Sequence, residues 1–149
     1  MQDIQIGVIG LGYVGLPLAV AFSRHFVVVG YDADSIRIAE LSEGKDRTKE
    51  VELASDEINQ STICFSDELE SLQGANFYCV CVPTPIDGEK KPDLGPLEKA
   101  CRTVARVLKK GDIVVFESTV YPGATDEVCI PLLEKHSGLQ LNEDFAVGY

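Results

Sequence analysis

Three glycines near the start of the chain have the spacing of a diphosphate-binding turn. Gly10, Gly12 and Gly15 follow the apolar run "IGVI" and precede "LPLAVAF". In a strand–turn–helix unit, the first glycine permits the tight turn, the second lets the backbone approach a pyrophosphate, and the third lets the helix pack close to the strand. The positive end of the helix dipole and its unpaired amides then face the phosphates. Because glycine-rich turns are common, this spacing needs support from its neighbours.

An acidic residue at the expected distance gives that support. Asp32 ends the apolar run "FVVVGYD" and lies 22 residues after Gly10. A carboxylate at the end of the second strand can accept hydrogen bonds from the adenosine ribose hydroxyls, and it would repel a 2′-phosphate. The pattern therefore predicts binding of NAD rather than NADP, although Arg37 is a positive charge close by in the sequence. The alternative is a strand–helix–strand unit whose glycines serve packing alone.

The rest of the chain alternates between strand-like and helix-like segments. Buried strands are expected at 4–9, 26–32, 61–66, 77–82, 112–119 and 145–149. Helices are expected at 14–22, 33–44, 96–109 and 125–136, with shorter helical segments at 52–58 and 67–72. This alternation predicts one α/β domain over residues 1–149, a Rossmann-like doubly wound parallel sheet in a three-layer α/β/α arrangement.

The carboxyl ends of such strands form the ligand-binding edge of the sheet. We therefore expect one crevice to contain the glycine-rich loop, Asp32, the "VPTP" turn and the "ESTV" turn. At the opposite edge, Lys109, Lys110 and Gly111 are expected to end the helix that starts at Pro96, because cations and glycine both favour a helix C-terminus.

Composition bears on partners and location. A formal net charge of −11 without a basic patch argues against nucleic acid as a partner. The chain has neither an apolar run of about 20 residues nor a basic-then-apolar leader, which predicts a cytoplasmic protein that does not enter the membrane.

The five cysteines are odd in number and lie mostly in apolar segments, so free thiols are expected. Cys79 and Cys81 could hold a metal, but no second pair at ligand spacing accompanies them.

Five motifs together resemble one enzyme family. The segments "GLGYVGLPLA", "GYDADSIRI", "VCVPTP", "PDL" and "ESTVYPGAT" are similar to the amino-terminal domain of UDP-glucose/GDP-mannose dehydrogenases, across essentially all 149 residues. "ESTVYPGATDEVCIPLLE" looks most like the branch that oxidises UDP-N-acetylglucosamine or UDP-N-acetylgalactosamine for capsule, Vi-antigen or O-antigen sugars. The resemblance implies that the C6 alcohol of a UDP-sugar is oxidised to a carboxylate by two hydride transfers to two NAD+.

The resemblance also implies roles for individual residues. Asp32 and Arg37 would hold the adenosine ribose, and Ser118 and Thr119 would lie near the nicotinamide, with Thr119 as the candidate catalytic residue. The full cofactor-binding set is Gly10, Leu11, Gly12, Tyr13, Val14, Gly15, Asp32, Arg37, Val82, Pro83, Thr84, Pro85, Ile86, Ser118 and Thr119. The alternatives are a solvated helix charge for Arg37, a turn cap for Thr119 and a stiff loop start for "VPTP".

Other parts that the resemblance implies have no match in these residues. They are the essential cysteine that forms a thiohemiacetal and then a thioester, its lysine and asparagine or aspartate partners, a glutamate, a linker helix and the UDP-sugar domain. We therefore expect a cofactor domain that binds NAD without turnover. Full-length relatives would be homodimers through the linker helix, which leaves this domain free to be a monomer. The alternatives are a 3-hydroxyacid or 6-phosphogluconate dehydrogenase domain, or a nucleotide-sensing module.

Overall fold

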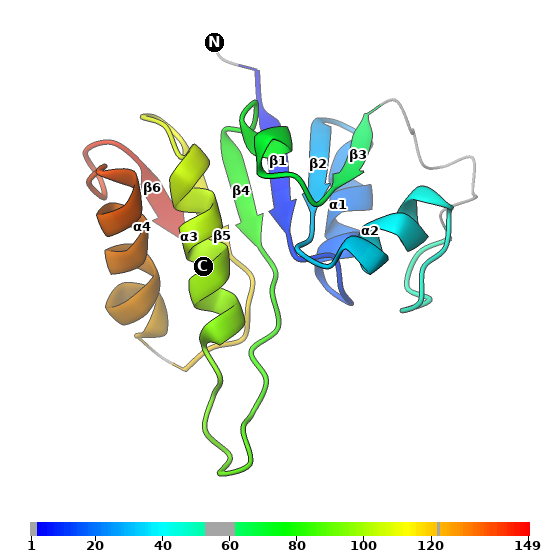
Figure 1. Cartoon of the computed structure of the whole chain (residues 1–149). Coiled ribbons are helices and arrows are strands. Elements are labelled where there is room, and N and C mark those ends of the chain that lie inside the picture. The colour runs from blue at the N-terminus through cyan, green and yellow to red at the C-terminus, as the bar shows by residue number, and fades with distance from the viewer. Residues whose placement is uncertain (1–2, 53–61, 122) are drawn as a thin grey trace.

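A parallel six-stranded sheet forms the centre of the computed structural model, which describes residues 3–52, 62–121 and 123–149. Its strand order is β3-β2-β1-β4-β5-β6, so the chain starts in the middle, builds one half and then crosses to build the other (Figure 1). The strands are β1 (Gln5–Ile9), β2 (Val27–Tyr31), β3 (Ile63–Ser66), β4 (Phe77–Val80), β5 (Ile113–Phe116) and β6 (Ala146–Gly148). This order confirms the predicted doubly wound topology.

Helices cover both faces of the sheet. They are α1 (Gly15–Ser23), α2 (Ser35–Ser42), α3 (Gly95–Val107) and α4 (Ile130–Ser137), with a 3₁₀ turn at Leu69–Leu72. Side chains that alternate along β1 divide the core in two. Ile6 and Val8 pack in a cluster with residues of α1 and α2, whereas Ile9 packs in a second cluster with residues of α3 and α4. The three-layer α/β/α prediction is confirmed.

Several predicted elements end earlier than expected; β5, for example, ends at Phe116 rather than at Thr119, and α2 ends at Ser42 rather than at Gly44. β4 ends at Val80 rather than Val82, although the Cys81 amide still donates to the Ile9 carbonyl at 2.7 Å. Pro83 and Pro85 have no amide hydrogen, so the ladder cannot continue beyond this point. α3 ends at Val107, and Leu108 is extended. Lys109 therefore does not cap the helix; its Nζ donates to the carbonyls of Gln73 and Ala75, at 3.3 and 2.9 Å.

The predicted helix over 125–136 begins differently from a regular α-helix. Thr125–Cys129 forms a π-helical turn that leads into α4. Pro131 has no amide hydrogen to donate to the carbonyl of Glu127, which favours the wider turn before it. The short helix predicted at 52–58 lies, apart from Glu52, outside the described residues.

The carboxyl ends of the strands lie at the end of the molecule where loop 81–94 projects from the body (Figure 1). The glycine-rich loop and the segment after β5 lie at this same end. Within residues 3–52, 62–121 and 123–149, no helix is long and apolar enough to cross a membrane.

Candidate functional site

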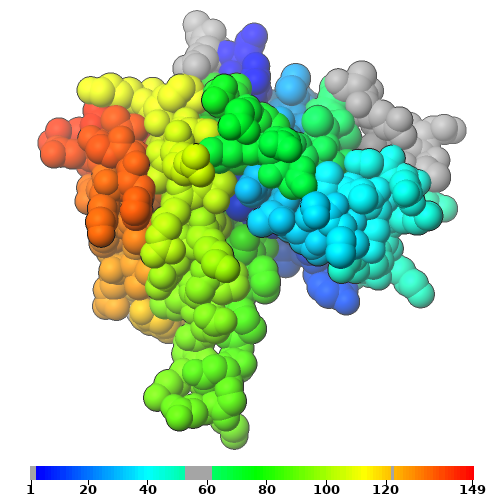
Figure 2. Space-filling model, viewed as in Figure 1, coloured from blue at the N-terminus to red at the C-terminus, as the bar shows by residue number. Residues whose placement is uncertain are grey.

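A cavity of about 420 Å³ lies at the carboxyl ends of β1, β2 and β4. We call it the first cavity. Its walls come from the glycine-rich loop, the end of β2, α2 and the loop after it, the start of the β4–α3 loop, and the first half of α3. In the space-filling view, blue atoms of the early chain are visible between α2 in cyan and α3 in yellow-green (Figure 2).

The three glycines of the loop have different surroundings. Gly10 has a φ of +93°, a conformation that side chains rarely adopt. A Cβ on Gly15 would lie 1.7 Å from the Gly10 carbonyl oxygen, so Gly15 is needed for packing. A Cβ on Gly12 would meet nothing within 4 Å, so Gly12 borders open space. The fold therefore requires glycine at positions 10 and 15, but packing alone would permit a side chain at Gly12.

Free backbone donors accompany that open space. The amides of Gly12, Tyr13 and Val14 make no hydrogen bond to any part of the chain that the structure describes. They precede α1, whose amino end carries the positive end of the helix dipole. Consecutive free amides at a helix N-terminus are suited to binding phosphate oxygens.

Asp32 connects the end of β2 to this loop. Its Oδ2 accepts a hydrogen bond from the Leu11 amide at 2.9 Å, and its Oδ1 accepts one from the Asp34 amide at the same distance. Both residues line the first cavity with Asp32. A carboxylate has room for further donors at each oxygen, so Asp32 can also accept from hydroxyl groups in the cavity.

Arg37 is buried, with 4% of its surface exposed, so the interpretation as a solvated helix charge is wrong. Its Nε donates to the Leu11 carbonyl at 2.9 Å, and its Nη2 donates to Asp46 at 2.8 Å. Its Nη1 lies 3.7 Å from Glu40 and makes no hydrogen bond within the described part of the chain. Arg37 thus braces the glycine-rich loop, and its remaining nitrogen faces Glu40.

Asp46 organises the loop that follows α2. Its side chain is 2% exposed and accepts hydrogen bonds from Arg37, from the amide and hydroxyl of Thr48, and from the amides of Glu50 and Val51. Burial alone would raise the pKa of Asp46, but these hydrogen bonds outweigh it and lower the pKa to about 2. The loop therefore presents Arg47 and Thr48 to the first cavity in a defined position.

Ser118 and Thr119 lie in a second cavity of about 340 Å³, formed by the segment after β5 together with Thr125, Asp126 and Tyr149. The residues that the sequence predicts to share one crevice therefore line two cavities. Two hydrogen bonds connect the turn after β4 to the turn after β5, between the two cavities. The Ser118 hydroxyl donates to the Val82 carbonyl at 2.7 Å, and the Thr84 hydroxyl donates to the Thr119 carbonyl.

The structure sorts the predicted site residues into three groups, and Ser118 and Thr119 in the second cavity are one of them. Lining the first cavity are Gly10, Leu11, Gly12, Asp32, Arg37, Val82 and Pro83. Neither cavity is lined by Tyr13, Val14, Gly15, Thr84, Pro85 or Ile86. Tyr13 and Ile86 are each 70% exposed, and Ile86 lies in the projecting loop 81–94. The Thr119 hydroxyl makes no hydrogen bond among the described residues, so its interpretation as a turn cap finds no partner.

Sequence reasoning missed several residues of the first cavity. Tyr31, Arg47, Thr48, Lys99 and Thr103 also line it. Burial raises the pKa of Tyr31, whose hydroxyl lies close to Thr103 on α3. Of these residues, only Tyr31 could have been predicted from the sequence, because it directly precedes Asp32. The others reach the cavity because α3 and the loop after α2 pack against it.

The five thiols differ in exposure and acidity. Cys79, Cys81, Cys101 and Cys129 are buried, whereas Cys64 is exposed. Burial raises the pKa of Cys79 and that of Cys81 to about 12, so both remain protonated at neutral pH. Among residues 3–52, 62–121 and 123–149, no three His, Cys, Asp or Glu side chains lie close enough together to hold a metal ion.

NAD fits the chemistry of the first cavity. The free amides of Gly12, Tyr13 and Val14 match a diphosphate, and Asp32, which lines the cavity with Gly12, matches ribose hydroxyls.

Comparison with known proteins agrees with this geometry. Residues 4–149 match the model of the NAD binding domain of the UDP-glucose/GDP-mannose dehydrogenase family. The chain is 56% identical to a UDP-N-acetyl-D-glucosamine 6-dehydrogenase of Pseudomonas aeruginosa over 150 positions, which cover 100% of this chain and 35% of that protein. It therefore spans about a third of the length of this curated relative.

Two solved structures are similar over almost the whole chain. A UDP-D-ManNAc dehydrogenase from Pyrococcus horikoshii gives a TM-score of 0.89 at 38% identity, covering 97% of this chain and 35% of that one. A ternary complex of GDP-mannose dehydrogenase from Pseudomonas aeruginosa gives 0.86 at 30% identity, covering 95% and 34%. The likeness is thus to one domain of larger enzymes.

Proposed function

The chain belongs to the UDP-glucose/GDP-mannose dehydrogenase family as its NAD-binding domain, and we propose that it serves an enzyme that oxidises the C6 alcohol of a UDP-N-acetylhexosamine to a carboxylate. The observation that carries this proposal is the row of free amides that begins at Gly12, which lines one cavity together with Asp32. The 56% identity to a UDP-N-acetyl-D-glucosamine 6-dehydrogenase favours that substrate class.

In this proposal the first cavity binds the adenosine half of the cofactor. The amides of Gly12, Tyr13 and Val14 donate to the diphosphate, for which only their backbones are needed, in agreement with the exposed Tyr13 side chain. Asp32 accepts from the adenosine ribose, and Arg37 holds the loop between them through the Leu11 carbonyl. Val82 and Pro83 form the opposite wall.

The second cavity then lies on the nicotinamide side. When bound, NAD+ supplies the hydride acceptor. Ser118 holds the wall between the cavities through the Val82 carbonyl, and Thr84 does so through the Thr119 carbonyl. The Thr119 hydroxyl is free to act near the reacting centre, by orienting water or substrate. Pro85 and Ile86 support this wall as part of loop 81–94 rather than by direct contact.

The remaining two thirds of the relatives' length would provide the UDP-sugar site and the groups that complete the oxidation. A cytoplasmic homodimer, with neither nucleic acid nor membrane as partner, is the arrangement proposed for the whole enzyme. A net charge of −11 fits the expectation that polyanions are not partners.

Two measurements test the proposal. Calorimetric titration of residues 1–149 with NAD+ should show one binding site. The longer protein should produce NADH from UDP-N-acetylglucosamine or UDP-N-acetylgalactosamine faster than from UDP-glucose. Failure to bind NAD+ would refute the cofactor assignment, and oxidation of UDP-glucose alone would refute the substrate class.

A further inference from the structure

Several charged side chains besides Asp32 line the first cavity. Asp32 and Asp34 line it together with Arg37, Arg47 and Lys99. Arginine beside the adenosine ribose is the usual means of accepting a 2′-phosphate. Asp32 is therefore not the only group that decides between NAD and NADP, because a guanidinium already lies in the same wall.

Arg47 is placed in this wall by its neighbours in the chain. Asp46 and Thr48 on either side of it are fixed by the hydrogen bonds that converge on the Asp46 carboxylate. The Arg47 side chain is 49% exposed and extends back toward α2. The loop fixes the position of Arg47, and the carboxylates that pair with its guanidinium decide how strongly it can attract a phosphate.

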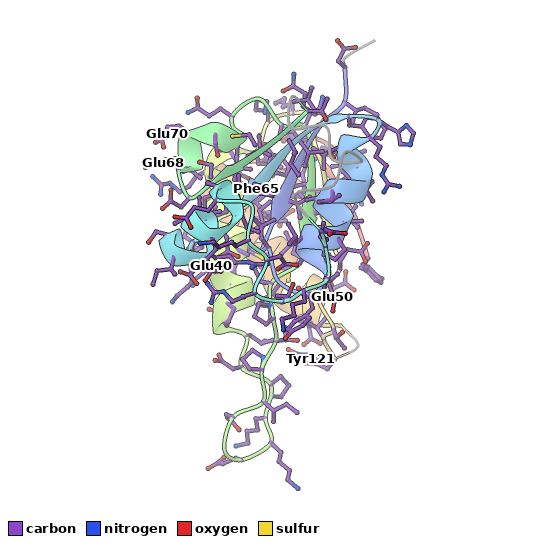
Figure 3. All side chains as sticks on the ribbon, turned by 90° about the vertical axis from the view of Figure 1, so that its right-hand side faces the viewer. Glu40, Glu50, Phe65, Glu68, Glu70 and Tyr121 are labelled. Carbon is purple, nitrogen blue, oxygen red and sulfur yellow. The ribbon has the colours of Figure 1, made fainter. Side chains whose placement is uncertain are left out.

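Two carboxylates of α2 and its cap engage Arg47. Its Nε donates to Glu40 Oε2 at 2.7 Å, and its Nη2 lies 3.5 Å from Asp34 Oδ2. Glu40 also lies 3.7 Å from Arg37 Nη1, so one carboxylate faces both guanidinium groups of the cavity. Figure 3 labels Glu40 on α2 and Glu50 on the loop that follows it.

We infer that Glu40 is a specificity-determining residue, which keeps Arg47 and Arg37 from binding the 2′-phosphate of NADP. Asp32 repels that phosphate directly, whereas Glu40, with Asp34, neutralises the cations that would otherwise attract it. Three carboxylates (Asp34, Glu40 and Asp46) pair with the two guanidinium groups, and Asp32 lines the same cavity, so these four carboxylates outnumber Arg37, Arg47 and Lys99. This inference rests on the proposed binding of NAD in the first cavity.

The test compares Glu40→Gln with a matched variant, Glu43→Gln. Both remove one negative charge from the C-terminal end of α2 and neither residue lines the cavity, but Glu43 pairs with Lys45 at 2.8 Å, whereas Glu40 pairs with the two arginines. We expect Glu40→Gln to lower the Kd for NADP+ about five-fold, as removal of one nearby charge in a solvated site predicts, while the Kd for NAD+ changes less than about two-fold. Glu43→Gln should leave both constants as in the wild type.

A double variant shows whether Arg47 carries the effect. Arg47→Gln alone should change NADP+ binding little, because Arg47 is already paired. In the Glu40→Gln background, the same change should remove most of the gained affinity, and added salt should weaken the gain. Calorimetry and competition against NAD+ measure the Kd for NADP+ in the wild type, the two single variants and the double variant. Circular dichroism verifies that each of them is folded.

The outcomes separate the inference from the function on which it rests. If the wild type binds no NAD+, the proposed function is refuted, and the inference with it. If NAD+ binds but Glu40→Gln shifts the NADP+ to NAD+ ratio no more than Glu43→Gln does, the inference alone is wrong. A gain that persists after Arg47→Gln would also overturn it.

Discussion

The carboxylate of Asp32 accepts a hydrogen bond from the amide of Leu11 at 2.9 Å, which ties the end of β2 to the glycine-rich loop. Asp32 therefore has two tasks in the proposed site. It presents an acceptor to the ribose, and it holds the loop from which the diphosphate donors project. A change at Asp32 should affect both the choice of cofactor and the strength of binding.

The first prediction concerns that choice. Wild-type protein should bind NAD+ at least about ten-fold more tightly than NADP+, a difference of about 1.4 kcal/mol, because Asp32 faces a 2′-phosphate with like charge. Asp32→Ala should narrow this ratio and weaken NAD+ binding, since the Leu11 amide loses its acceptor. Calorimetry with both cofactors measures the two effects.

A suitable control is Asp87→Ala. Asp87 also accepts hydrogen bonds from two backbone amides, those of Glu89 and Lys91, but it lies in the projecting loop outside both cavities. This variant should keep the wild-type ratio. Equal affinity of the wild type for the two cofactors would contradict the role given to Asp32.

The second prediction separates binding from packing in the glycine-rich loop. Gly12→Val should abolish NAD+ binding with the fold intact, because a side chain there enters open space beside the free amides. Gly15→Val should destabilise the domain by about 3 kcal/mol or more, since its Cβ would overlap the Gly10 carbonyl. Circular dichroism and thermal unfolding of both variants provide the comparison. An unfolded Gly12→Val protein would make Gly12 a packing residue.

The sequence predicted the sheet and the glycine–aspartate pair because both depend on local patterns. Short apolar runs mark each strand, and parallel strands bring their carboxyl ends to one edge, so Asp32 had to lie near Gly12. Arg37 was harder to place. Its partners, Leu11 and Asp46, lie 26 and 9 residues away, and no periodicity in the sequence indicates that an arginine on α2 will be buried between them.

The division into two cavities also had no local signal. It depends on hydrogen bonds between the turns after β4 and β5, which lie about 35 residues apart in the chain. Arg47 was missed for a related reason. The polar stretch after α2 reads as an ordinary solvated loop, and the converging bonds to Asp46 that order it are specified by tertiary contacts.

The third prediction concerns stability at low pH. The pKa of Asp46 is lowered to about 2 from an ordinary value of 3.8, so the folded state favours the ionised form. The resulting stability is present above about pH 4 and is lost as the pH falls toward 2. The loss from this one group should be about 1 to 2 kcal/mol, given that its loop is partly solvated.

Asp46→Asn should therefore destabilise the protein at pH 7, because Arg37 is left buried without its anionic partner. The gap in unfolding free energy between wild type and variant should shrink between pH 4 and pH 2, as the wild type protonates. Denaturant unfolding at a series of pH values measures it. A gap that stays constant to pH 2 would show that the Asp46 charge does not contribute.

The last prediction concerns the thiols and turnover. Cys64 is exposed, the other four thiols are buried, and the pKa values of Cys79 and Cys81 are raised to about 12. An aromatic disulfide reagent should therefore modify one thiol quickly in the folded chain and all five after unfolding. Cys79 and Cys81 are buried and protonated and so cannot attack an aldehyde, and Cys64, Cys101 and Cys129 line neither cavity. Residues 1–149 should accordingly produce no NADH from UDP-glucose, UDP-N-acetylglucosamine or UDP-N-acetylgalactosamine while still binding NAD+. Turnover that disappears when one of these cysteines is replaced by alanine would place the nucleophile inside this domain.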